Sequence, residues 1–162
     1  MDTGIHLTRA AKRIYEEIRT QRKHRYATLA VQQDCEISVD ALGNRAASYD
    51  DFLADLLGEG KAVGAAVGAA VGAGAGQCRF AIYDYEYEHQ FKQMDKSSHK
   101  QKLILFLWCP AQASVRDKMI YSSSISSIMR FFIGIQKFIQ ANSPDDVSRA
   151  AVELQLRALD RD

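Results

Sequence analysis

The chain has 162 residues, of which 47% are apolar and 25% are charged, and its formal net charge is +1. This length and balance predict one globular domain with a hydrophobic core and exclude a disordered chain. The small net charge gives no overall field that would select nucleic acid. Cys35, Cys78 and Cys109 lack metal-ligand spacing, so we expect reduced thiols in a cytoplasmic protein. The polar N-terminus lacks the apolar core of a signal peptide.

The first third of the chain predicts a helix, a hairpin and a short helix. Residues 5–22 carry apolar side chains at helical spacing with basic residues between them, which is typical of an amphipathic helix. Residues 26–31 and 35–41 are apolar segments joined by a polar turn, which indicates an antiparallel pair of strands. Ser48 with Asp51 three residues later predicts a capping box at the start of a short helix.

Residues 58–77 form an alanine-valine-glycine repeat that breaks this pattern. Glycine is entropically unfavourable to order, and alanine and valine bury little area, so we interpret the segment as a flexible surface insertion. The glycine spacing is also typical of helix packing in membranes. However, the uncharged stretch covers only 62–76, fewer than the ~20 residues that a span needs, so no transmembrane segment is predicted.

The rest of the chain predicts three strands and two helices. Residues 80–88 and 102–110 are the longest strand candidates, and the second is apolar on both faces, as in a covered central strand. Ser114 begins a helix that we expect to run without a break to about Gly134. A short strand over 137–141 precedes a final helix that starts at Pro144. The order predicts an α/β (α+β) fold in which helices cover a mixed sheet of about five strands.

Catalytic and metal chemistry find little support in the pattern. The histidines are scattered, and the serines at 122–127 lack a nucleophile-elbow turn, so we expect no enzyme, no metal site and no cofactor. Asp84, Glu86 and Glu88 share one face of a strand, which we interpret as a solvated or lysine-paired surface rather than an acid–base site. Basic clusters at 19–25 and 96–102 could meet an acidic partner or acidic lipid headgroups, or could be solvated faces.

Three segments carry a family resemblance: FAIYDYEYE (80–88), KLILFLWCP (102–110) and SVRDKMIYSSS (114–124). In this order they resemble the actin-depolymerising factor/cofilin family, and the resemblance covers nearly the whole chain outside 58–77. It implies a single homology domain of that family with a gelsolin-like fold. It also implies a monomeric cytoplasmic protein of the actin cytoskeleton that binds monomeric and filamentous actin and promotes severing and depolymerisation. Acidic phosphoinositide headgroups are a second implied partner.

The resemblance also implies site residues. Thr3 and Gly4 correspond to a Ser-Gly pair whose serine is phosphorylated in the family, so Thr3 is a candidate actin contact and phosphorylation site. Arg116 and Lys118 correspond to basic residues that touch actin. A second, filament-specific contact would use basic residues before the tryptophan strand, Lys100 and Lys102. It would also use charged residues of the last helix, where the register is loose: Glu153, Arg157 and Arg161.

The helix after Tyr121 departs from the family pattern. A usual Lys-Asp pair is replaced by Ile125 and Ser126, and a usual arginine is replaced by Met129, while Arg130 remains. Ile125, Met129 and Ile133 recur every four residues and predict an apolar ridge on the actin-binding face, with Ile128, Phe132 and Ile135 left for the core. The ridge is either an exposed strip that docks on actin or a surface buried by a local cover, such as the 58–77 insertion or another chain. The alternative function is a monomer-binding or regulatory module of the same fold with weak or no severing.

Overall fold

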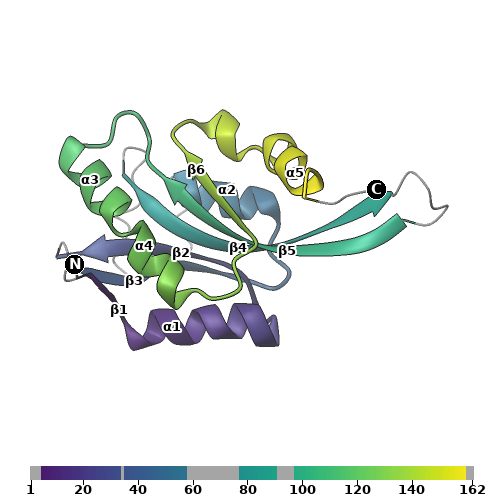
Figure 1. The fold of residues 1–162 in the computed structure, drawn as a ribbon, viewed down its shortest axis with the longest axis horizontal. Helices are drawn as coiled ribbons and strands as arrows, with labels where there is room; N and C mark the ends of the chain where they lie inside the picture. Colours follow the sequence, from purple (N-terminus) through teal and green to yellow (C-terminus); the bar gives the residue numbers. More distant parts are fainter. Residues whose placement is uncertain (1–4, 34, 58–76, 91–96, 160–162) are drawn as a thin grey trace.

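The computed structural model of the protein describes residues 5–33, 35–57, 77–90 and 97–159. Its centre is a six-stranded sheet in the order β1-β3-β2-β4-β5-β6 (Figure 1). The strands are β1 (His6–Leu7), β2 (His24–Gln32), β3 (Glu36–Asn44), β4 (Arg79–Gln90), β5 (Ser97–Trp108) and β6 (Lys137–Ala141). The outer pairs β1–β3 and β5–β6 are parallel and the inner pairs are antiparallel, so the predicted mixed sheet is confirmed.

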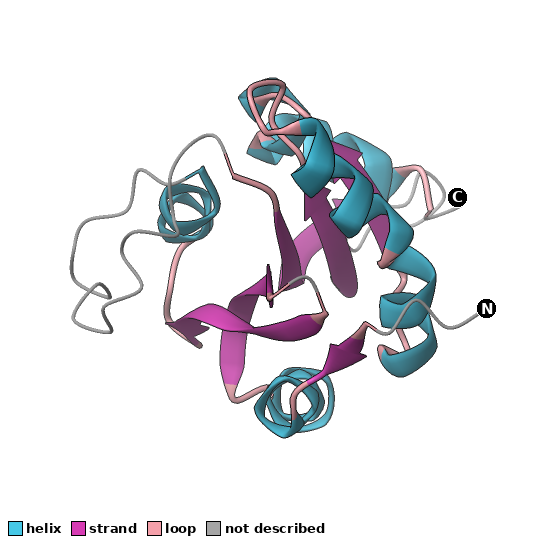
Figure 2. Cartoon of the chain, turned by 90° about the vertical axis from the view of Figure 1, so that its left-hand side faces the viewer, coloured by secondary structure: helices cyan, strands magenta, loops and turns pink. Residues whose placement is uncertain are grey.

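Helices cover both faces of the sheet (Figure 2). Helix α1 (Arg9–Glu16), the π-helical segment η1 (Glu17–Gln21), α3 (Val115–Ser123) and α4 (Ile125–Phe131) contribute to one core cluster. On the opposite face, α2 (Tyr49–Leu57), the 3-10 segment η4 (Pro144–Val147) and α5 (Arg149–Arg157) contribute to a second cluster. Within the described part of the chain, no helix is both long and apolar enough to span a membrane.

The apolar end of β5 explains why both faces need cover. Leu103, Leu105 and Leu107 belong to the first cluster, and the alternate residues Ile104, Phe106 and Trp108 belong to the second. All six side chains are buried. Side chains alternate across a strand, so an unbroken apolar run requires helices on both sides, as the sequence predicts.

The prediction of a helix beginning at residue 5 is wrong, because the N-terminal residues first enter the sheet. His6 and Leu7 pair with Glu36 and Ile37 of β3, which makes β1 a sixth strand in place of the expected five. The helix begins after Thr8, whose side-chain oxygen accepts a hydrogen bond from Ala11 N at 3.1 Å. An apolar pattern over a few residues suits a strand edge as well as a helix, so the sheet partner decides.

The predicted continuous helix from Ser114 to about Gly134 is also wrong, since it breaks at Ser124. The Ser124 hydroxyl donates to Ile120 O at 2.6 Å, and Ser124 N bonds to Tyr121 O at 3.1 Å. A serine that bonds back onto its own helix competes with the regular ladder and bends it. Gly134, with φ of 98°, follows the second helix, in agreement with the predicted stop.

Of the remaining local predictions, some are confirmed and one is wrong. The hairpin of β2 and β3 and the capping box are present, with Asp51 N donating to Ser48 Oγ at 3.1 Å and Ser48 N donating to Asp51 Oδ2 at 3.0 Å. The final helix does not start at Pro144: η4 comes first, and Ser148 then caps α5. Residues 58–76 of the predicted insertion lie outside the described residues.

Gly43 in β3 allows a close contact with Tyr26 and provides a test of the packing. A Cβ atom added at Gly43 would lie 2.1 Å from Tyr26 Cε2. The buried Tyr26 ring is also held by its hydroxyl, which donates to Asp55 Oδ2 at 2.6 Å. Although alanine usually suits a strand better than glycine, we expect Gly43→Ala to lower the free energy of unfolding by about 1–3 kcal/mol through overpacking. Urea unfolding measures the change, and a midpoint equal to or above that of the wild type would show that the ring can move aside.

Candidate functional site

Helix α3 leaves the sheet at a sharp corner that sets its position. Cys109 N donates to Ala141 O at 2.9 Å, which ends the pairing of β5 with β6, and Pro110 follows. A turn closed by Ala113 N and Pro110 O at 3.0 Å leads to Ser114, whose Oγ accepts from Asp117 N at 3.1 Å. This cap fixes the first turn of α3 at the surface.

The predicted basic pair lies on that first turn. Arg116 is exposed, and Lys118 is half-buried with its ammonium group donating to Ala111 O at 3.0 Å. The corner carbonyl therefore holds the Lys118 charge close to the start of the helix. Arg130 is exposed on α4, the next helix along the chain.

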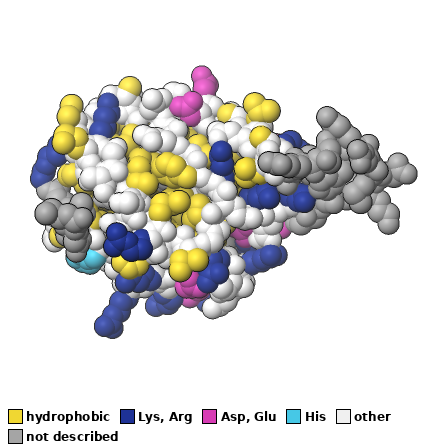
Figure 3. Space-filling model, in the orientation of Figure 1, with side chains coloured by type: hydrophobic (Ala, Val, Ile, Leu, Met, Phe, Trp, Pro, Cys, Tyr) yellow, Lys and Arg dark blue, Asp and Glu magenta, His cyan; other side chains and the backbone are white. Residues whose placement is uncertain are grey.

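Apolar side chains accompany these charges on both helices. On α3, the side chains of Val115 and Met119 are 73% and 67% exposed; we call them the α3 apolar pair. Met129 on α4 and Ile133 after it are 41% and 71% exposed; we call them the α4 apolar pair. Hydrophobic side chains gather over the middle of this face of the molecule, with lysines and arginines around them (Figure 3). Exposed apolar side chains beside basic groups suit a partner whose binding surface is apolar and is bordered by acidic side chains.

The structure divides the predicted ridge. Ile125 is half-buried and packs against the first core cluster, whereas Met129 is exposed. Ile133 lies beyond Phe132, the residue that caps the end of α4, so the three side chains do not form one continuous helical ridge. Ile128 and Phe132 are buried, and Ile135 packs against their cluster, as predicted.

Tyr15 of α1 holds the end of α4 in place. Its ring stacks on Phe132 with centroids 4.3 Å apart, and its hydroxyl donates to Ile133 O. Burial raises the pKa of Tyr15, which keeps the hydroxyl protonated as a donor. With its carbonyl bonded inward, Ile133 keeps its side chain exposed to solvent.

The α3 apolar pair was missed by the sequence analysis. The signal was available, because Val115 and Met119 are four residues apart and share a helix face. The predicted actin contacts were instead the basic residues between them, Arg116 and Lys118, and the segment after Tyr121. The burial of Tyr121 and the packing of Ile120 against the first core cluster show which side of α3 faces the core.

The residues predicted for a second contact gather at the other end of the sheet. Lys100 and Lys102 of β5 lie opposite Tyr87 and Tyr85 of β4, so their side chains share the face that α5 covers. On α5, the Arg157 guanidinium lies 5.2 Å from the Tyr87 ring centroid and donates to Glu88 O at 2.8 Å. Glu153 lies 3.7 Å from Arg157. Thr3, Gly4 and Arg161 lie outside the described residues.

The acidic strand face is divided: Asp84 and Glu86 are paired with arginine, which the sequence analysis did not predict, whereas Glu88 is exposed, as predicted. Buried Asp84 accepts from Arg45 at 2.6 Å and from the Gln101 amide, and Glu86 accepts from Arg25 at 2.7 Å and from Arg45 at 3.3 Å. The sequence could not name these partners, because Arg25 and Arg45 come from β2 and from the segment after β3. These hydrogen-bonded pairs join the end of the β2–β3 hairpin to β4.

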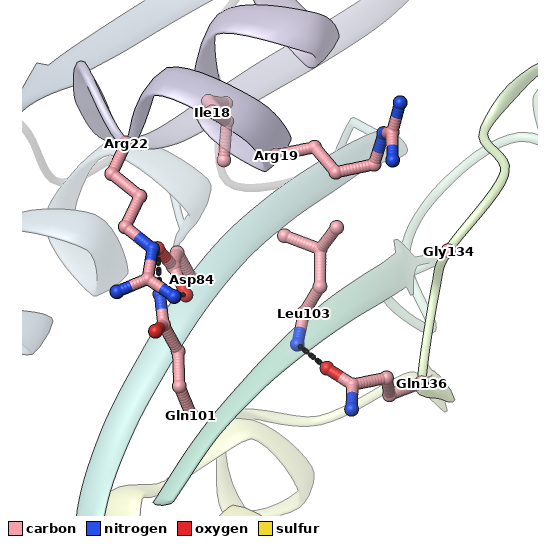
Figure 4. A pocket seen from close by; sticks show the side chains of 8 residues that line it. All are labelled: Ile18, Arg19, Arg22, Asp84, Gln101, Leu103, Gly134 and Gln136. Carbon is pink, nitrogen blue, oxygen red and sulfur yellow. Dashed lines mark hydrogen bonds between the residues drawn. The ribbon is translucent and has the colours of Figure 1, made fainter.

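A polar hollow of about 240 Å³ lies beside this network (Figure 4). Arg19 and Arg22 approach it from η1, Asp84 and Gln101 from the sheet, and Gln136 from the segment before β6, where Gln136 Oε1 accepts from Leu103 N at 2.9 Å. Asp84 is engaged by Arg45 and Gln101, so its environment is that of a structural ion pair. Across the described ranges of the chain, no three His, Cys, Asp or Glu side chains gather as a metal site would require.

Comparison with known proteins connects this geometry to a family. The model of the cofilin/tropomyosin-type actin-binding proteins matches residues 4–157. Actin-depolymerizing factor 4 of Oryza sativa subsp. japonica is 30% identical over 152 residues, which cover 93% of this chain and 94% of the relative. Actophorin of Acanthamoeba castellanii is 28% identical over 151 residues and 93% of both chains. The crystal structure of Streptomyces griseoflavus cofilin superposes with a TM-score of 0.73 at 26% identity, over 93% of this chain and 96% of that chain.

Proposed function

The chain belongs to the family of cofilin/tropomyosin-type actin-binding proteins, and we propose that it binds monomeric and filamentous actin and promotes the severing and depolymerisation of filaments. The observation that carries the proposal is the family match over residues 4–157. Relatives named for actin depolymerisation cover nearly the whole chain, which supports the same activity here. The function is one of binding rather than catalysis, performed by a single domain in the cytoplasm.

The proposed contact with an actin monomer is the surface of α3 and α4. The α3 apolar pair would enter an apolar cleft, where burial contributes about 25 cal/mol for each Å² removed from water. Arg116 and Lys118 would face acidic groups at the rim and set the orientation of the helix. Met129, Arg130 and Ile133 extend this surface, and Ile125 supports it from the core. Thr3 and Gly4 would add an N-terminal contact that phosphorylation of Thr3 weakens.

Filament binding requires a second contact, which we assign to Lys100, Lys102, Glu153 and Arg157. Their support is spatial, because β4, β5 and α5 bring them to one end of the sheet. Two contacts on neighbouring actin subunits would let the protein prefer one filament twist. Binding that favours a twisted state shifts the population toward it and weakens contacts between subunits without a covalent step.

Co-sedimentation with actin filaments tests this function. Binding with loss of pelleted actin supports severing and depolymerisation, whereas binding to monomers without filament loss supports the alternative of a monomer-binding or regulatory module. No binding to either form would reject both. Vesicles that contain acidic phosphoinositides, added as competitor, would test the proposed headgroup binding, and analytical ultracentrifugation would test the proposed monomeric state.

Met129→Arg tests the α4 part of the surface. Met129 is partly exposed, so we expect the free energy of unfolding to change by less than about 1 kcal/mol. The added charge should speed association with acidic actin a few-fold at low salt, with a steeper salt dependence. Leu154→Arg on α5, where Leu154 is 73% exposed, adds the same charge elsewhere and should leave monomer association unchanged. A large loss of stability in Met129→Arg would mean that Met129 belongs to the core.

A further inference from the structure

Two of the three cysteines face each other at the end of the central hairpin. Cys78 immediately precedes β4 and Cys109 immediately follows β5. The last antiparallel pair of that ladder is Arg79 with Trp108, so the next residues, Cys78 and Cys109, lie opposite each other. Both belong to the first core cluster, with exposures of 0% and 8%, whereas Cys35 lies elsewhere beside β3.

The surroundings of the two thiols differ. Interaction with the Cys78 side chain lowers the pKa of Cys109, with a further contribution from the Lys118 ammonium; burial and the Asp117 carboxylate act in the opposite direction. Interaction with the Cys109 side chain, burial and the charge of Asp117 raise the pKa of Cys78, which Lys118 opposes. Cys109 is also the more exposed of the two thiols, so it is the one that an oxidant can reach first.

The backbone geometry permits a covalent bond between them. Residues directly opposite in an antiparallel pair have Cα atoms about 4.5–5.5 Å apart, and disulfides span Cα distances of about 4.4–6.8 Å. The cross-link would join neighbouring chains of the sheet without a change of register. Cys109 also keeps the small exposed area through which a small oxidant could reach it.

We propose that Cys109 and Cys78 form a peroxide-driven thiol–disulfide pair, in which Cys109 is the reacting thiol and Cys78 the resolving thiol. The Cys109 thiolate attacks one oxygen of hydrogen peroxide; the S–O bond forms, the O–O bond breaks, and the departing hydroxide takes a proton to leave as water. The Cys78 sulfur then attacks the sulfenic sulfur; the S–S bond forms, the S–O bond breaks, and a second water leaves with the Cys78 proton. Two thiols are oxidised together by two electrons, and the peroxide is reduced to two waters.

The modification site lies beneath the start of α3 but does not depend on actin binding. Closing the β4–β5 hairpin with a disulfide restricts the unfolded chain, so the oxidised protein should melt several degrees higher than the reduced protein. Because the inference concerns thiol chemistry, its failure would leave the proposed function untouched.

Peptide mapping after treatment with stoichiometric hydrogen peroxide tests the proposal on the full chain. We expect a linked peptide containing Cys78 and Cys109, lighter than the sum of its parts by two hydrogen atoms, together with the rise in melting temperature, and reversal of both by dithiothreitol. The matched control Cys35→Ser should give the same product. Cys78→Ala should stop at a Cys109 sulfenic acid that dimedone captures.

Three results would overturn the proposal: thiols of Cys78 and Cys109 that remain unmodified while Cys35 reacts, a disulfide that includes Cys35, or oxidation of Cys109 to sulfinic acid without a linked peptide. If Cys78→Ala does not fold, the wild type and Cys35→Ser still decide between these outcomes.

Discussion

Replacing Met119 by aspartate is expected to weaken the binding of actin monomers by at least about 100-fold, or about 2.7 kcal/mol. Met119 belongs to the α3 apolar pair and is 67% exposed, so the change should leave the fold intact. On binding, the variant loses the burial of a methionine side chain, about 1.5–3 kcal/mol, and must also desolvate a carboxylate. Titration of fluorescently labelled monomeric actin measures the loss.

Two controls separate the causes of this loss. Met119→Gln removes apolar burial without adding charge, so it should fall between the wild type and Met119→Asp. Leu154→Asp on α5 introduces the same charge at a side chain that is 73% exposed, and it should bind monomers as the wild type does. Equal monomer affinity for Met119→Asp and the wild type, in a folded protein, would remove the α3 apolar pair from the interface.

The second large effect is expected for the basic pair. Arg116→Ala combined with Lys118→Ala should lower monomer affinity by about 30- to 100-fold, because truncating both charges leaves the acidic groups that they face on actin without partners. Folding should change little, since Arg116 is exposed and Lys118 has its hydrogen bond to Ala111 O at the surface. The loss should shrink as salt is raised, because part of it is electrostatic.

A matched pair of substitutions controls for net charge. Arg22→Ala combined with Lys23→Ala removes the same two charges at the far end of η1, where both side chains are exposed. This double variant should keep monomer affinity within about threefold of the wild type. If both double variants lose affinity equally, general electrostatic attraction would account for the effect, and Arg116 and Lys118 would not be specific contacts.

Local sequence determined much of the secondary structure. The apolar run at the end of β5 requires cover on both faces, because alternate side chains point to opposite sides. The capping pairs Ser48 with Asp51 and Ser114 with Asp117 set helix starts through contacts between residues three apart. Such features depend on near neighbours in the chain, so they can be predicted before the fold is known. The segments that resemble the cofilin family likewise pointed to the correct family and fold.

Tertiary structure decided the features that depend on residues far apart in the chain. Residues 6–7 form a strand because β3 is beside them, and Asp84 is buried because Arg45 reaches it from outside β4. The split of the predicted apolar ridge follows from the break at Ser124 and from the anchoring of Ile133 by Tyr15. The facing of Cys78 and Cys109 is set by the register of β4 with β5. Periodicity states which side chains share a face of one element, but burial depends on what packs against that face, and only the assembled sheet and helices specify it.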